Sequence, residues 1–125
     1  MFERKLYTVN LSGTEYPIKC SISVLEKIQD AYGSIEEFEK KIQLFDENEK
    51  FKMPDLQAVG DGLFWMCQEG ADITEAEELT REKIMHEADS FINAALEIHS
   101  EFMRCFDTKN RMSTKMEKTQ EKTQP

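Results

Sequence analysis

The alternation of apolar and polar positions near the start of the chain predicts a β-hairpin. In KLYTVNLSGTEYPIKC, residues 5–20, the side chains of Tyr7, Val9 and Leu11 fall on one face of an extended strand. Ser12-Gly13-Thr14 supplies the residue types of a tight turn. Because Pro17 has no N–H to donate, the second strand should lie at an edge of its sheet.

After this hairpin the apolar spacing changes to the period of a helix. The segment SISVLEKIQDAYG, residues 21–33, predicts a short helix with Ser21 or Ser23 as its N-cap and Gly33 as its stop. A second short helix should begin at once, because Ser34-Ile35-Glu36-Glu37 has the pattern of a capping box.

The middle of the chain predicts a loop and then a third helix. The polar stretch FDENEKFKM, residues 45–53, indicates a loop or a small irregular hairpin. Asp55 can cap a helix that ends just before Gly70, which would be the residue that terminates it. Residues 71–80 read as a connector that has a cap of its own at Thr74.

The last periodic segment predicts one long helix from Thr80 to Phe106, with a wide apolar face that would make it the spine of the core. These elements together predict an α+β, mostly α-helical fold, in which an N-terminal β-hairpin packs on a small helical bundle. By length we expect one globular domain, residues 1–106. The polar, low-complexity residues 107–125 should form a disordered tail.

The net charge of −9 is unevenly distributed. The tail from Asp107 onward has five basic and three acidic residues, a charge of +2, so residues 1–106 carry −11. An acidic body argues against nucleic acid as a partner, since binding to phosphates needs Lys and Arg. A basic or cationic-faced protein is the partner that this charge favours.

The cysteines and the apolar runs indicate the cellular location of the chain. Its three cysteines form no C-x-x-C pair, and an odd number cannot complete a disulfide framework, which fits a reducing cytosol. No segment approaches the ~20 apolar residues of a membrane span, so we expect no membrane contact and a location in the cytoplasm.

The chain has glycine, histidine and cysteine residues that could form a binding or catalytic site, but their sequence contexts argue against one. Gly60 and Gly62 lie within a helical period rather than after a strand, which excludes a phosphate loop. His86 and His99 are too far apart in the helical period to form a zinc site. Cys67 falls on an apolar face, where burial makes a thiol inert. We therefore expect no catalytic residue, no cofactor and no metal.

Trp65 is the residue least explained by a buried helix. It lies nine residues after Leu56, which places it about 180° from that residue at ~100° per residue. Either the helix is buried on two sides or Trp65 contacts a partner. The sequence leaves both interpretations open.

The order of these elements resembles a known family. A hairpin with a tyrosine-proline step, YPIKCSISVLEKIQDAYGS, followed by IEEFEKKI, a central helix and a terminal helix, is similar to the tail assembly chaperones of long-tailed phages and prophages of Gram-positive bacteria. The resemblance covers about residues 5–106, and its most specific part is residues 16–38. It includes no active-site residues, and the helix around Trp65 matches no motif of the family.

This resemblance implies a non-enzymatic protein of the host bacterial cytoplasm. Such a chaperone binds the aggregation-prone tape measure protein while the tail assembles, and the tail tube protein is the second candidate partner. In many members a translational frameshift yields a longer product, and residues 107–125 lie where that extension would begin. Methionines repack readily, so apolar helix faces rich in them suit a holdase, and a homo-oligomer would cover such faces in the free protein.

The sequence predicts a set of partner-binding residues and leaves two other functions open. The predicted contact residues are Trp65, Met66, Phe102, Met103 and Phe106. The first alternative is a structural phage tail or head–tail joining component. The second, ranked below it, is an acidic inhibitor that mimics DNA, which would bind a basic enzyme in a salt-sensitive manner.

Overall fold

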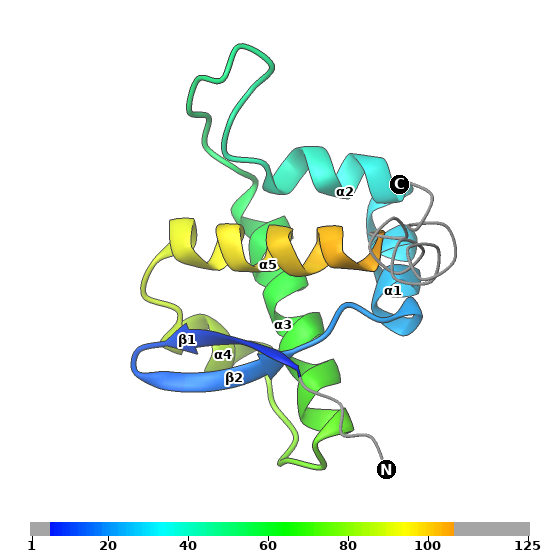
Figure 1. The fold of residues 1–125 in the computed structure, drawn as a ribbon, viewed down its shortest axis with the longest axis vertical. Coiled ribbons are helices and arrows are strands. Elements are labelled where there is room, and N and C mark those ends of the chain that lie inside the picture. Colours follow the sequence, from blue (N-terminus) through cyan, green and yellow to red (C-terminus); the bar gives the residue numbers. More distant parts are fainter. Residues whose placement is uncertain (1–5, 107–125) are drawn as a thin grey trace, which may run out of the picture.

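The structure, a computed structural model, describes residues 6–106 and is α+β and mostly helical, as the sequence predicts (Figure 1). The disordered tail expected for residues 107–125 lies outside the described residues. The strands and helices are β1 (Tyr7–Leu11), β2 (Thr14–Ile18), α1 (Ile22–Tyr32), α2 (Ile35–Ile42), α3 (Leu56–Ile73), α4 (Arg81–Glu87) and α5 (Phe91–Cys105).

The N-terminal hairpin has the predicted strands. β1 and β2 pair antiparallel, with Val9 opposite Tyr16, and both of these side chains are buried. The turn places Ser12 and Gly13 at positive φ, the conformation that two-residue hairpin turns require. Pro17 pairs opposite Thr8 in this two-stranded sheet, where each strand has one open edge.

The first two helices begin and end where their capping residues predict. The Ser21 hydroxyl accepts a hydrogen bond from the backbone N–H of Val24 at the start of α1. Gly33 ends α1 with φ of +86°, a conformation that glycine adopts without strain. Ser34 caps α2 by accepting from the N–H of Glu37.

Helix α3 is the centre of the fold, and it is longer than predicted. It contacts β2, α1, α2, α4 and α5, and it runs through the middle of the molecule while α5 crosses it (Figure 1). Gly70 does not end it: the helix continues to Ile73, and Thr74 is its C-cap rather than the start of another turn. A Cβ at Gly70 would lie 2.0 Å from the carbonyl oxygen of Pro17, so this glycine serves close packing against β2.

The long terminal helix predicted from Thr80 to Phe106 is in fact two helices. Thr80 does cap α4, but Ala88 leaves the helical conformation with ψ of 106°. The Ser90 hydroxyl then accepts from the N–H of Asn93 and starts α5. A serine that offers its own acceptor to the backbone favours a new N-cap over a continuous helix. The spine of the core is therefore α3, against which both α4 and α5 pack.

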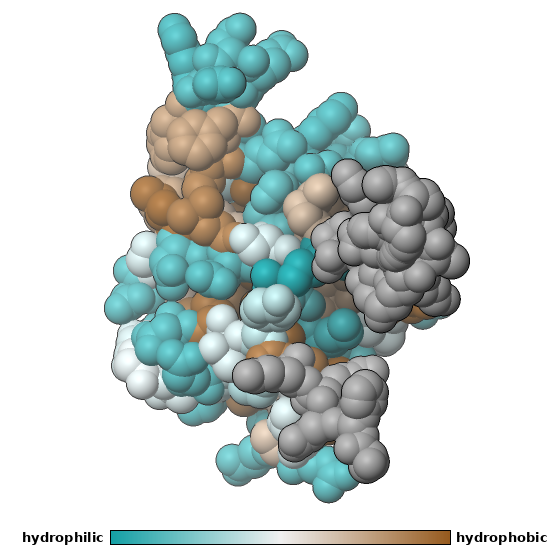
Figure 2. Space-filling view, viewed as in Figure 1, coloured by the Kyte–Doolittle hydropathy of each residue, from teal (hydrophilic) through white to brown (hydrophobic). Residues whose placement is uncertain are grey.

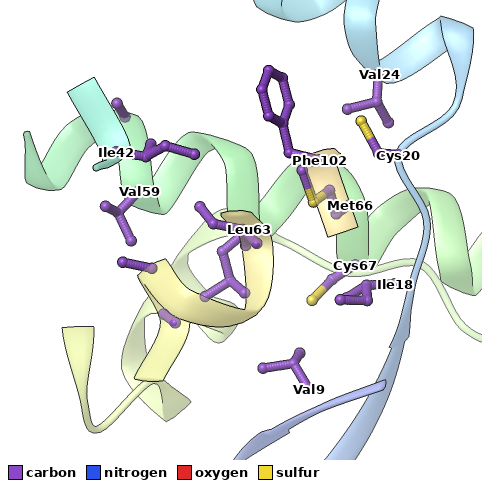
Figure 3. Close-up of a cluster of buried hydrophobic side chains, with 14 of the residues drawn as sticks. Val9, Ile18, Cys20, Val24, Ile42, Val59, Leu63, Met66, Cys67 and Phe102 are labelled. Atoms are coloured by element: carbon purple, nitrogen blue, oxygen red, sulfur yellow. The ribbon is translucent and has the colours of Figure 1, made fainter. Parts of the chain in front are cut away.

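The core lies where α3 meets the hairpin, α2 and α5 (Figure 3). Side chains with essentially no exposure fill it from every one of these elements. They include Ile18, Phe38, Leu63, Met66, Ile98 and Phe102. Cys67 faces this core too, as the apolar pattern predicts.

The polar stretch between α2 and α3 forms the small irregular hairpin that the sequence indicates. Phe45 and Phe51 make an isolated antiparallel bridge. The Asp46 carboxylate closes the turn between them by accepting from the N–H groups of Asn48, at 2.8 Å, and Lys50, at 3.0 Å. This loop extends away from the helices at the top of Figure 1.

Candidate partner-binding surfaces

Two of the five predicted contact residues belong to the core and are not on the surface. Met66 is 0% and Phe102 1% exposed. The chain after β2 crosses α3 at Met66, where the N–H of Lys19 donates to the Met66 carbonyl at 3.1 Å. Phe102 packs its ring against Phe38, with centroids 5.6 Å apart. Neither side chain is available to a partner in this conformation.

Met103 and Phe106 are exposed at the C-terminal end of α5. Each is 43% exposed. The Phe106 ring packs edge-on against Phe102, with centroids 5.1 Å apart, so one side of it continues the core and the other faces solvent. These two residues remain compatible with partner contact.

Trp65 packs against the core on one side, and its contact with a partner stays a prediction. It is half-buried and packs against the core, and it also lines a surface hollow of about 410 Å³. The segment between α3 and α4 forms another wall of this hollow. Gln68 of α3 holds that segment in place, because its side-chain oxygen accepts a hydrogen bond from the N–H of Leu79 at 3.0 Å. No residue of α5 lines this hollow, so Met103 and Phe106 do not contribute to it.

A second apolar surface, which sequence reasoning missed, lies on the loop before α3 and on α5. Phe45 and Phe51 are 55% and 53% exposed, and their rings meet edge to face with centroids 6.5 Å apart. Leu96 of α5 is 51% exposed and lines a hollow of about 210 Å³ together with Phe45. We call Phe45, Phe51 and Leu96 the loop–α5 surface.

Figure 2 shows apolar side chains gathered directly below the polar tip of the protruding loop. Further apolar side chains follow in the chain, since Met53 is 60% and Leu56 51% exposed. A sequence signal for this surface existed: two phenylalanines and a methionine occur within a stretch that is otherwise polar. Because charged residues surround these three side chains, the pattern predicted a solvated loop and did not predict an apolar surface.

The hollow of the loop–α5 surface has an apolar floor and one polar corner. Ile42 and Leu44 are buried beneath it, and His99 stands at its edge. The His99 ring nitrogen lies 3.4 Å from a carboxylate oxygen of Glu39. His99 is thus a partly buried, hydrogen-bonded side chain, whereas His86 is exposed.

The perturbed titratable groups serve packing between elements. Burial and a hydrogen bond to Glu87 raise the pKa of the Tyr16 phenol to about 12. The same bond lowers the pKa of Glu87. Burial raises the pKa of the Cys67 thiol to about 12, which keeps it protonated at neutral pH. The hydrogen bond between Tyr16 and Glu87 joins β2 to α4, and the Cys67 thiol fills part of the core.

Within residues 6–106, no group of three or more His, Cys, Asp or Glu side chains is placed to hold a metal ion. No helix in the same range is long and apolar enough to cross a membrane. Comparison of the chain with models of protein families, with curated proteins and with solved structures found no match.

Proposed function

We propose that this protein is a non-enzymatic tail assembly chaperone of a long-tailed phage or prophage. It binds the tape measure protein in the bacterial cytoplasm and shields apolar segments of that protein until the tail tube assembles. The support is of two kinds: the sequence pattern of residues 16–38, and an exposed aromatic surface suited to binding another chain.

The loop–α5 surface is the observation that carries the proposal. Two aromatic rings that are each more than half exposed, next to a leucine and an open apolar hollow, leave a contiguous apolar area in contact with water. Such areas mark interaction sites, and aromatic residues, phenylalanine among them, are enriched at the cores of protein interfaces. A holdase needs a surface of this kind.

The chemistry of the partner segment follows from this surface and from charge. An apolar helix face can lie in the hollow between Phe45 and Leu96. Basic residues flanking that face would be attracted by the body of the chain, which carries −11 over residues 1–106. The predicted partner segment is therefore an amphipathic helix with basic flanks.

A double substitution on the loop tests the proposal. Phe45→Ser with Phe51→Ser removes both exposed rings and leaves the core intact, since neither side chain is buried. We expect the variant to fold and to lose at least tenfold in affinity for the tape measure protein, measured by co-purification and by titration with fragments of that protein. This loss corresponds to about 1.4 kcal/mol or more.

The matched control is Ile22→Ser. Ile22 is 76% exposed on α1 and does not line either of the two hollows described above. The Ile22→Ser substitution also removes an exposed apolar side chain, but it should leave the affinity for the tape measure protein unchanged. Phe102→Ala is unsuitable as a test, because truncation of a core phenylalanine costs about 3–5 kcal/mol and unfolding would imitate a binding defect. Equal binding by the double variant and by wild type would reject the loop–α5 surface.

The main alternative, a structural tail component, predicts a different location. A chaperone acts before assembly is complete and leaves, so mass spectrometry of purified virions should detect the tail tube protein without this chain. Finding this chain in the virion at a fixed ratio to the tube protein would favour the structural role.

A further inference from the structure

Two cysteines far apart in the sequence meet at one corner of the fold. Cys20 lies between β2 and α1, and Cys105 is the last residue of α5, 85 positions later. The Cys105 thiol donates a hydrogen bond to the carbonyl oxygen of Cys20, with 2.5 Å between Sγ and oxygen. The nearby Cys105 side chain is also the main cause that raises the pKa of the Cys20 thiol, ahead of burial.

The backbone on both sides of this pair is held by polar contacts. Glu101, although 4% exposed, accepts from the N–H of Cys20 at 2.9 Å. Arg104 pairs with the same Glu101 carboxylate at 2.8 Å. The guanidinium of Arg104 also lies over the ring of Tyr7, 3.4 Å from its centroid. The end of α5 is thus fixed against β1 and the Cys20 linker before any covalent bond forms.

We propose that Cys20 and Cys105 form a reversible intramolecular disulfide. The geometry favours this bond, because the Cys105 sulfur already lies against the backbone of Cys20, and a disulfide needs the two residues to be close neighbours. The bond would join the N-terminal hairpin to the end of α5. An oxidised low-molecular-weight disulfide such as glutathione disulfide is the oxidant.

The reaction proceeds by two exchanges. The Cys105 thiolate attacks glutathione disulfide, which breaks that S–S bond and releases one glutathione thiolate. The Cys20 thiolate then attacks the mixed disulfide, forms the Cys20–Cys105 bond and releases the second glutathione. Two protein thiols are oxidised, one glutathione disulfide is reduced, and the two protons pass to solvent and glutathione. Cys105 reacts first because it is half-buried, whereas Cys20 is 3% exposed.

Cys67 takes no part in this bond. It is 0% exposed, and burial alone accounts for the raised pKa of its thiol. The odd number of cysteines therefore resolves into one neighbouring pair and one core thiol. From the sequence, we considered only whether all the cysteines could pair in a complete disulfide framework. Spacing along the chain could not show that the first and third cysteines are neighbours.

The test uses the full chain incubated with excess glutathione disulfide. We expect the mass to fall by about 2 Da, and the thiols labelled after denaturation to fall from three to one, with Cys20 and Cys105 joined in the peptide map. Closing so long a segment of chain should raise Tm by roughly 10 °C or more. Oxidation should be faster at pH 9 than at pH 7, since the thiolate is the attacking species.

Matched variants separate this pairing from its alternatives. Cys105→Ser should stop the mass change and the rise in Tm, whereas Cys67→Ala should retain both, because it leaves the pair untouched. Three free thiols after prolonged oxidation would overturn the proposal. So would a disulfide that includes Cys67, or one that joins two chains on a non-reducing gel.

Discussion

Gly70 lies within α3, directly against the backbone of β2. After an apolar helical run, a glycine commonly marks the end of the helix. Here the backbone of β2 passes so close to α3 that no Cβ fits, and the helix continues beyond this position. The glycine is required by a contact with Pro17, which is 53 positions earlier in the chain and invisible to a local pattern.

Substitution of Gly70 by alanine should therefore destabilise the fold despite the better helix propensity of alanine. We expect Gly70→Ala to lower the free energy of unfolding by at least about 2 kcal/mol, because backbone atoms of β2 must move. The measurement is urea-induced unfolding followed by circular dichroism.

Gly60→Ala is the matched control for this prediction. Its added Cβ would meet only the ends of the Arg81 and Met85 side chains, which can rotate away. Its free energy of unfolding should stay within about 1 kcal/mol of wild type. Equal effects of the two substitutions would show that the approach of β2 to α3 does not constrain Gly70.

Glu101 is the other residue whose role depends on distant neighbours. A glutamate on a helix is normally expected in solvent. This one is buried because Arg104 neutralises it from one turn away and the N–H of Cys20 donates to it. The Glu-x-x-Arg spacing offered a weak signal for the ion pair, but nothing in the sequence indicated the bond to Cys20.

At the scale of elements, the break between α4 and α5 is the largest departure from the predicted fold. The apolar positions of residues 81–106 keep a helical period across the break, so periodicity alone predicts one helix. Ser90 ends that continuity by capping α5, and the two shorter helices can then each reach α3.

This interpretation predicts a measurable role for the Ser90 hydroxyl. Ser90→Ala should lower the free energy of unfolding by about 1 kcal/mol, because the N–H of Asn93 loses its acceptor. Ser100→Ala, at an exposed position within α5, is the control and should be neutral or slightly stabilising. The measurement is thermal unfolding of wild type and the two variants. Equal stability of the two variants would show that the Ser90 hydroxyl does not stabilise α5 as a cap.

At the scale of the whole molecule, the phenol and thiol groups enclosed between elements set an alkaline limit to stability. The pKa of Cys67 rises from 9.0 to about 12 on folding, and that of Tyr16 from 10.0 to about 12. Because the folded state holds these protons more tightly, the stability they contribute is complete below pH 9. It is lost progressively as pH rises toward 12.

We therefore expect these two groups alone to lower the free energy of unfolding by about 2–4 kcal/mol between pH 9 and pH 11. Burial also raises the pKa of the Tyr32 phenol, which should add to the fall. Tyr16→Phe should start lower at pH 8, since it loses the hydrogen bond to Glu87, but should fall by about 1 kcal/mol less over the same range. Urea unfolding at each pH provides the comparison. A fall equal to that of wild type would show that the Tyr16 phenol does not set this limit.

The sequence by itself determined what depends on neighbouring residues. The hairpin, the helix caps at Ser21, Ser34 and Asp55, and the α+β class follow from side chains that act within a few positions of themselves. The inward direction of Cys67 follows from helical periodicity in the same way. These features need no knowledge of what lies across the core.

Tertiary structure alone decided which apolar side chains are covered. Met66 and Phe102 became core, Phe45 and Phe51 became surface, and α3 became the central helix. Each outcome depends on which element lies opposite, and a one-dimensional pattern does not record this. The meeting of Cys20 with Cys105 has the same origin, because long-range packing brings together two cysteines that no spacing rule connects.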